Sequence, residues 1–402
     1  MKLSTFTSIS VFAVALSLLF SVSSASNNGK KQTIDIPPVT PDHRGMYSGN
    51  TRIFFGGVED RRLVDDPSYV GITQTGLTNH PTPVFLSEPV KEFFSRSIAG
   101  FIGNCGMATN DPEKASFKLY IELYDCSYSE MTFAASEYGM AQVVFVAKFQ
   151  AHSGEKVLLV RAFHVDKRFD LTKYVPEILH EVLKQSAERL CASNAFLSFI
   201  EPDQRAVFEQ NFPDPPDLEK WLKKSSRFLT ADPIYSLKEP VDLSGYTNLC
   251  LSGISITDKR YSGSIQAAER EIKQTMYTQL IERLYKKFNV GTSEDNVKTG
   301  KTISLSCTIF EFTPYRGATQ GVMIGLFGPV GFLAGHGRLD AVCTVKDSVT
   351  GDVLAEIPFK TSANMLSNEC MFAEFSLSIA TFLSRCKEDL PSASMEVSWA
   401  GG

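Results

Sequence analysis

The chain contains two stretches whose apolar and polar residues follow the same order of strand-like and helix-like periods. Each stretch opens with an apolar run that contains glycine, RIFFGGVEDRR at 52–62 and NLCLSGISITDKR at 248–260. A segment with helical periodicity follows each run, at 87–106 and at 262–291. Two copies of one pattern therefore organise most of the chain.

The next segments of both copies have the pattern of strands. Apolar and polar residues alternate in SFKLYIELYDCSY (116–128) and in TISLSCTIFEF (302–312), which is typical of a strand with one buried face. Each copy then has a hairpin and a closing helix: 141–165 with 172–193, and 338–361 with 368–386. The order β-α-β-β-β-α thus occurs twice.

This order predicts an α+β fold of two tandem β-α-β-β-β-α domains, each a small mixed sheet of about four strands covered on one face by two helices. A proline-dense stretch separates the copies and predicts a linker. The predicted parts are a signal peptide at 1–25, an extended N-terminal segment at 26–50, the first repeat at 51–200, the linker at 201–244, the second repeat at 245–390 and a flexible tail at 391–402.

The first 25 residues have the composition of a secretory signal peptide. Lys2 gives a positive start, residues 9–20 are apolar, and Ser23-Ser24-Ala25 is a small-residue cleavage site. The alternative is a retained membrane anchor, which is disfavoured because the apolar stretch is shorter than the ~20 residues of a spanning helix. We therefore expect an exported protein of the periplasm or cell envelope, with secretion as the alternative.

The composition and net charge of the chain limit the classes of function that it can have. Apolar residues make up 43 % and charged residues 21 % of the chain, which is enough for a normal core in each copy. The net charge of −5 and the lack of a long basic block argue against nucleic acid as a partner.

Eight cysteines in an exported chain favour disulfides, but no C-x-x-C motif marks a redox or zinc site. Cys250, Cys307 and Cys343 lie within apolar strand patterns, and we predict them as small buried hydrophobes rather than disulfide partners. Cys370 and Cys386 lie on one predicted helix about 24 Å apart, which is too far for them to pair with each other.

The sequence resembles the domains of YajG-type envelope lipoproteins. The resemblance rests on the element order, on the groups Asp60/Arg62 and Asp258/Arg260 after the first strand of each copy, and on the run VKDSVTGDVL at 345–354. The lipopolysaccharide-assembly lipoprotein and the amino-terminal domain of the Tol-system propeller protein are similar in architecture. The chain departs from the pattern by having two copies and no lipidation cysteine. The resemblance implies a non-enzymatic envelope protein that binds or supports another component.

A Gly-rich run, GATQGVMIGLFGPVGFLAGHG at 317–337, joins the second and third strands of the second copy. It is too short and too broken by proline and glycine to span a membrane, and it lacks the lysine of a phosphate-binding loop. In the first copy, residues 129–140 form the shorter equivalent connection. The apolar side chains of the run either contact a partner protein or membrane surface, or fold back onto the domain. They are Ile324, Leu326, Phe327, Phe332 and Leu333.

The Asp-x-Arg groups are the polar candidates for a site. Residues two apart on a strand share a face, so Asp60 can pair with Arg62, and Asp258 with Arg260. Each pair either contacts a polar ligand at the end of the first strand or is a surface ion pair that stabilises the strand end by ~0–1 kcal/mol.

The motifs of common enzymes and metal sites are incomplete or missing. His180-Glu181 begins an H-E-x-x-H pattern, but Lys184 occupies the position of the second histidine. The six histidines lack metal-ligand spacing, and no G-x-S-x-G occurs. We therefore predict no catalytic residue, metal or cofactor. His336 and Arg338, beside the Gly-rich run, are weaker binding candidates.

The favoured hypothesis is a non-enzymatic exported envelope protein, an accessory or adaptor subunit that binds a protein partner or the membrane surface through 317–337. The alternative is a periplasmic carrier of a lipid or another amphiphile. A remote alternative is an enzyme of undetected class. The sequence leaves open whether the two domains pack together.

Overall fold

The structure is a computed structural model of the chain. It describes residues 31–37, 39, 47–75, 80–133, 136–167, 174–208, 229–231, 241–258, 265–292, 300–313, 337–363 and 368–387. The predicted signal peptide and C-terminal tail lie outside these residues.

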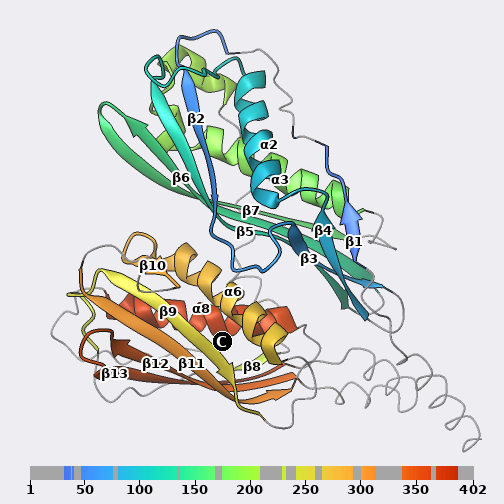
Figure 1. The fold of residues 1–402 in the computed structure, drawn as a ribbon, viewed down its shortest axis with the longest axis vertical. Helices are drawn as coiled ribbons and strands as arrows, with labels where there is room; N and C mark the ends of the chain where they lie inside the picture. The colour runs from blue at the N-terminus through green and yellow to red at the C-terminus, as the bar shows by residue number, and fades with distance from the viewer. Residues whose placement is uncertain are drawn as a thin grey trace, which may run out of the picture.

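The first unit is built on a mixed sheet, sheet A, with two helices on one face (Figure 1). Its central strands follow the order β2-β5-β6-β7, in which β2 is parallel to β5 and the other pairs are antiparallel. The elements are β2 (Ile53–Asp60), α2 (Val90–Asn104), β5 (Phe117–Phe133), β6 (Ser136–Ala151), β7 (Gly154–Lys167) and α3 (Val175–Ala192), followed by the short α4 (Asn194–Leu197) and η2 (Pro202–Val207).

Three further strands extend sheet A. They are β1 (Gln32–Ile34), β3 (Tyr69–Thr75) and β4 (His80–Leu86), in the order β1-β4-β3-β5. Strand β3 meets β5 where Gly71 pairs with Tyr128. A Cβ on Gly71 would lie 1.8 Å from the carbonyl oxygen of Tyr128, so this close approach requires glycine.

The second unit repeats the central order in sheet B as β9-β11-β12-β13, with β9 parallel to β11. Its elements are β9 (Asn248–Ile256), α6 (Ile265–Leu284), β11 (Thr302–Thr313), β12 (Gly337–Asp347), β13 (Val353–Ala363) and α8 (Asn368–Cys386). Two short strands complete the sheet: β10 (Asn289–Gly291) beside β9, and β8 (Leu229–Ala231) beside β13. Strand β8 comes from the predicted linker.

The predicted fold class is confirmed, because both units are mixed sheets with the order β-α-β-β-β-α at their centre. The expectation of about four strands in each sheet is wrong: the described residues form seven strands in sheet A and six in sheet B. Of residues 129–140, predicted as a connection, 129–133 belong to β5 and 136–140 belong to β6. The backbone ladder between the two strands continues as far as the pair Phe133 and Ser136.

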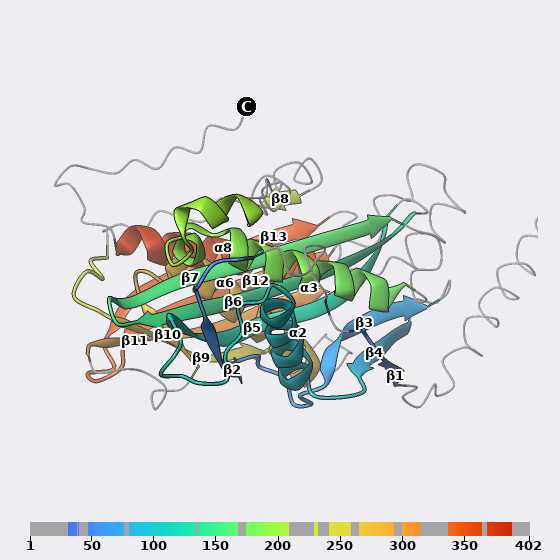
Figure 2. The same cartoon turned by 90° about the horizontal axis from the view of Figure 1, so that it is seen from above.

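The two units pack against each other in alternating layers of helices and sheets (Figures 1 and 2). Helices α2 and α3 cover one face of sheet A, and α6 and α8 lie between its other face and sheet B. The helices of the second unit therefore serve both sheets. Sheet A is covered on both faces, whereas none of the described helices and strands lies on the outer face of sheet B.

The second face of sheet A is apolar at its centre, which explains why it is covered. Tyr124, Val144 and Val146 belong to the same buried cluster as the core of the second unit. The ring of Tyr124 lies 5.7 Å from that of Tyr277 on α6, in an edge-to-face arrangement. Burying each of these side chains stabilises the contact by up to about 2 kcal/mol.

Polar contacts fix the register between the units. Gln274 on α6 accepts a hydrogen bond from the Leu63 N–H at 2.7 Å and donates one to the Tyr124 carbonyl at 2.9 Å. Arg161 on β7 lies 3.3 Å from Glu282 of α6, and both side chains are largely buried. Because these groups have lost water, they favour one arrangement of the two units.

Helix α2 shows why the helices form where the pattern predicts them. Pro89 precedes its first residue, and Gly106 follows its last turn with a φ of 78°, a conformation that favours glycine. Its apolar residues at spacings of three and four lie in the core: Val90, Phe93, Phe94, Ile98, Phe101 and Ile102. No helix in the described part of the chain has the length and apolar character needed to cross a bilayer.

Candidate functional site

The strongest candidate site lies at the end of sheet B from which residues 314–336 depart. We call this end the loop base and define it as Ile309–Thr313 of β11 together with Gly337–Ala341 of β12. The two segments are antiparallel partners, and Thr313 faces Arg338. The connection therefore leaves and re-enters the sheet on neighbouring strands.

Charged side chains tie three strands together at the loop base. Arg338 lies 3.1 Å from a carboxylate oxygen of Glu311 and 3.0 Å from one of Asp340. Lys360 on β13 lies 3.9 Å from Asp340. These groups are partly exposed, so each pair contributes little to stability.

A disulfide joins the same two strands further along the sheet. Cys307 on β11 and Cys343 on β12 are cross-strand partners whose Cα atoms lie 4.1 Å apart. Both are buried, and the sulfur of Cys307 lies 3.8 Å from that of Met276 on α6. The prediction for these two cysteines is correct on burial and wrong on pairing, because antiparallel pairing places their sulfurs within bonding distance. Cys250 is buried, as predicted.

Asp258 lies beneath the loop base instead of on the surface. Its side chain is buried, and Oδ2 accepts a hydrogen bond from the backbone N–H of Phe312 at 2.9 Å. The carboxylate therefore holds the last inward-facing residue of β11 before the connection begins. Its predicted partner Arg260 lies outside the described residues.

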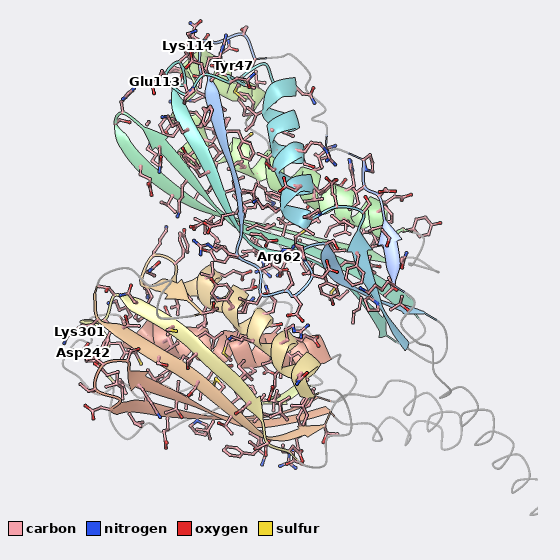
Figure 3. All side chains as sticks on the ribbon, in the orientation of Figure 1. Tyr47, Arg62, Glu113, Lys114, Asp242 and Lys301 are labelled. Carbon is pink, nitrogen blue, oxygen red and sulfur yellow. A yellow bond between two sulfur atoms is a disulfide. The ribbon has the colours of Figure 1, made fainter. Side chains whose placement is uncertain are left out.

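The ion pair between Asp60 and Arg62 is present, but it is not a surface pair. The Arg62 side chain is only 2 % exposed, and its guanidinium donates to both Asp60 oxygens at 2.9 and 2.8 Å. It also donates to the carbonyls of Pro67 and Tyr69 at 2.8 and 2.7 Å. The surface interpretation is wrong because the chain after β2 folds back over the guanidinium, near the level where the two units meet (Figure 3). A ligand contact of this pair stays a prediction.

The two Asp-x-Arg groups do not occupy equivalent places. In each unit the first strand has an irregularity directly before a glycine, Gly57 in β2 and Gly253 in β9. Counting five residues on from these glycines matches Arg62 with Asp258, since 57 + 5 is 62 and 253 + 5 is 258. The groups are therefore offset by two residues. Matching them by sequence alone is wrong.

A substitution of Arg62 tests whether its buried guanidinium stabilises the fold. Arg62→Lys keeps the charge but loses the planar fork, so we expect the free energy of unfolding to fall by about 1–2 kcal/mol. The control is Arg61→Lys, because the Arg61 side chain is 34 % exposed; we expect a change below about 0.5 kcal/mol. Urea unfolding monitored by circular dichroism gives both values. Equal values for the two variants would contradict the role assigned to Arg62.

The predicted apolar contact residues lie outside the described residues. This holds for Ile324, Leu326, Phe327, Phe332 and Leu333, and also for His336. The structure describes the strands on which the connection begins and ends, so the prediction for the connection itself stands as made.

Phe310 is a candidate that the sequence analysis missed. The ladder between β11 and β12 has a bulge between Ile309 and Glu311, which leaves Phe310 outside the ladder and 55 % exposed. Bulges are frequent beside binding sites because they redirect a side chain. The alternation held a signal: Phe310 follows Ser306 and Thr308 on the polar face of the strand, where an aromatic residue is unexpected.

A groove of about 550 Å³ lies at the edge of sheet A. It is bordered by the end of β7, the first turns of α3 and the N-terminal segment, and is lined by Pro37, His164, Asp166, Pro176, Glu177, Ile178, His180 and Glu181. Its carboxylate groups, Asp166, Glu177 and Glu181, suit a cationic ligand. Within the described residues, no three His, Cys, Asp or Glu side chains are arranged to hold a metal ion.

Several buried carboxyl groups have a raised pKa because burial disfavours their charged form. These are Asp125, Glu282 and Glu374. Gln142 donates to Asp125 at 2.7 Å, and Thr361 donates to Glu374 at 3.1 Å. None of the three lines the groove or belongs to the loop base, so their shifted pKa values reflect packing within and between the units.

Burial also raises the pKa of several thiols. The pKa is raised to about 11 for Cys105 and Cys386 and to about 12 for Cys126. Little thiolate exists at neutral pH at such values, so these cysteines act as packing groups and not as nucleophiles.

The chain is similar to several solved structures at low sequence identity. Protein XCC0632 from Xanthomonas campestris, of family DUF330, has 14 % identity and a TM-score of 0.31, with 44 % of this chain and 99 % of that chain covered. The PelC dodecamer from Paraburkholderia phytofirmans has 13 % identity and a TM-score of 0.26, with 39 % and 96 % covered. The hypothetical protein CT253 from Chlamydia trachomatis has 11 % identity and a TM-score of 0.24, with 35 % and 96 % covered.

No protein-family model matches the chain, and no curated protein sequence matches it. At these TM-scores the three likenesses assign neither a family nor a function to the chain. The function is therefore argued from the site.

Proposed function

We propose that the protein is an exported, non-enzymatic accessory or adaptor subunit of the cell envelope. Its contact with a partner protein or the membrane surface is made through residues 317–337. The two units are proposed to be domains of the YajG type, which their element order and short motifs resemble.

The disulfide between Cys307 and Cys343 is the observation that carries this proposal. Disulfides persist in oxidising spaces outside the cytoplasm, which supports export. This disulfide also links the two strands from which the connection departs. A loop that leaves a covalently closed, rigid pair of strands is a typical arrangement for a binding element.

The carrier hypothesis receives less support from the described residues. Their groove is lined mainly by carboxylates, imidazoles and prolines, whereas an amphiphile needs a largely apolar cavity. The adaptor hypothesis is therefore preferred, and lipid binding becomes one outcome of the test.

The test compares the intact chain with a variant in which residues 319–335 are replaced by a short Gly-Ser turn. Both are crosslinked in native envelopes, captured, and floated with vesicles of phosphatidylethanolamine and phosphatidylglycerol. We expect the intact chain to capture a defined partner or to float, and the variant to lose this at least about tenfold, the loss expected when a central contact is removed.

The matched control replaces residues 348–351, the turn at the opposite end of the same sheet, by Gly-Ser. This control should behave as the intact chain does, and all three proteins should share one circular dichroism spectrum. Capture and flotation that are equal in all three would contradict the adaptor proposal. Lipid that co-purifies equally with all three would favour the carrier.

A further inference from the structure

A network of polar side chains crosses the contact between the two units. Gln142 on β6 donates a hydrogen bond to Oδ2 of Asp125 on β5 at 2.7 Å, and its Oε1 accepts one from Arg161 on β7 at 3.4 Å. Nε of Arg161 lies 3.3 Å from Oε1 of Glu282 on α6. We call these four residues the interface network. Its two carboxyl groups, one from each unit, share a single arginine.

The interface network contains buried polar atoms that lack a partner. Nε of Arg161 and Oε1 of Glu282 make no hydrogen bond to any described residue, although they lie close together. Gln279, one turn earlier on α6, donates to the other oxygen of Glu282 at 3.3 Å, but its own Oε1 is also buried without a donor. The unpaired acceptors thus outnumber the unpaired N–H by one. A bound proton supplies the missing donor.

Other charged groups near the network do not balance its second carboxylate. On sheet A, Arg62 acts on Asp125, but it is already held by the bidentate pair described above. On α6, Arg283 acts on Glu282, but this arginine is exposed and water screens its charge. Glu374 of the neighbouring helix α8 is bonded within the second unit. Positive charge is therefore short at the contact.

The titration of the two carboxyl groups agrees with this shortage. Burial raises the pKa of both Asp125 and Glu282, and Arg161 opposes the rise in each. The charge of Asp125 raises the pKa of Glu282 further, so the two groups are close enough to disfavour each other's ionisation. They consequently titrate as a pair, which keeps a proton at a pH where carboxyl groups in water have lost theirs.

We propose that the interface network makes the contact between the two units depend on a proton. With one proton held between Asp125 and Glu282, a single carboxylate faces the arginine and α6 stays on sheet A. Loss of the proton leaves a second buried carboxylate without a partner, so the contact loosens. Loosening uncovers the apolar centre of sheet A at Tyr124, Val144 and Val146. The pH therefore controls a surface that the closed form hides.

Acid favours the closed form. A carboxyl group whose pKa is raised in the closed form favours that form below its pKa in water, and this effect is lost as the pH rises through the raised value. The ratio of open to closed molecules should rise by up to about tenfold per pH unit in that range, which is the slope for the release of one proton.

The distance between two spin labels measures the opening. Unnatural amino acids carry the labels at Ser153 and Val349, which lie in the equivalent hairpin turns of the two sheets and are exposed. The full chain keeps its cysteines. We expect the distance to increase between about pH 5 and about pH 9, while the far-ultraviolet circular dichroism stays constant.

Substitutions of the carboxyl groups identify the source of the response. Asp125→Asn leaves one carboxylate for one arginine at every pH, so this variant should stay closed up to about pH 9. Glu282→Gln should lose the response for the same reason. The matched control is Glu374→Gln, which removes a buried carboxyl of raised pKa from within the second unit. It should respond as the natural chain does.

An infrared measurement keeps the test valid if a variant fails to fold. In the natural chain and in Glu374→Gln, the carbonyl band of a protonated carboxyl group should disappear over the pH range in which the label distance increases. A distance that is constant from about pH 5 to about pH 9 overturns the proposal. A response that Asp125→Asn shares with Glu374→Gln does the same. So does a loss of circular dichroism in that range, because the change is then global unfolding.

Discussion

Replacing Arg161 by methionine is expected to lower the free energy of unfolding by about 3–5 kcal/mol near neutral pH, because it leaves a buried carboxylate unpaired. Arg161 and Glu282 come from different units, lie 3.3 Å apart and have side chains that are 18 % and 7 % exposed. The substitution should therefore weaken the contact between the two sheets. Urea unfolding monitored by circular dichroism measures the change.

The same variant should regain stability in mild acid. Burial raises the pKa of Glu282, and Arg161 opposes that rise, so removing Arg161 raises the pKa further. A carboxyl whose pKa is raised in the folded state favours folding below its unfolded pKa and loses this effect as the pH rises through the folded value. The loss in Arg161→Met is thus largest near about pH 7.5 and shrinks toward about pH 5.

Arg270→Met is the matched control at the same contact between units. Arg270 lies 2.5 Å from Asp65, but their side chains are 50 % and 71 % exposed. We expect a loss below about 1 kcal/mol, because water screens an exposed pair. If Arg161→Met and Arg270→Met have equal, pH-independent effects, the buried pair does not hold the units together.

Replacing Cys307 and Cys343 by alanine is expected to destabilise the chain by about 3–4 kcal/mol. The disulfide closes a segment with a sequence separation of 36, and removing the link lets the unfolded chain gain entropy. Both cysteines are buried and belong to sheet B itself, so the double variant also loses a packed link between β11 and β12.

Thermal unfolding with and without reductant isolates the effect of the disulfide. The melting temperature of the natural chain should fall in dithiothreitol toward that of the double variant, which itself should not respond. Cys126→Ala, which removes a buried thiol outside this disulfide, should leave the response to reductant intact. A natural chain that melts at the same temperature in both conditions would contradict the disulfide.

The periodic parts of the sequence predicted the fold well. The helix predicted at 368–386 is α8, and the strand predicted at 302–312 is β11 within one residue. The hairpin β3–β4, in which Pro81 and Pro83 pair with Gln74 and Ile72, was not predicted.

The contact between the two units could not be predicted from the pattern of apolar and polar residues. Helix α6 is buried on one side by sheet B and on the other by sheet A, so polar residues such as Gln274 and Glu282 lie in positions that periodicity assigns to solvent. The pairing of Cys307 with Cys343 depends on strand register, which cysteine spacing alone does not give. The same dependence on register explains the false match between Asp60 and Asp258.

The candidate site was only half predictable. The sequence located the connection and the charged residues near it, including Asp258 and Arg338. It missed Phe310 as a site residue: alternation placed this side chain on the polar face of the strand, but the bulge beside it could not be predicted. Such irregularities follow from pairing between strands and are read from the sheet, not from the strand alone.

The central claim is that the loop-base end of sheet B contacts another component of the cell envelope. A photo-crosslinking residue placed at Phe310, and in a second strain at Val349, tests it in living cells, because both positions are exposed on sheet B at opposite ends. We predict one defined crosslinked product from position 310, mapped by mass spectrometry to a partner protein, and none from position 349. No product at 310, or the same products at both positions, would contradict the account.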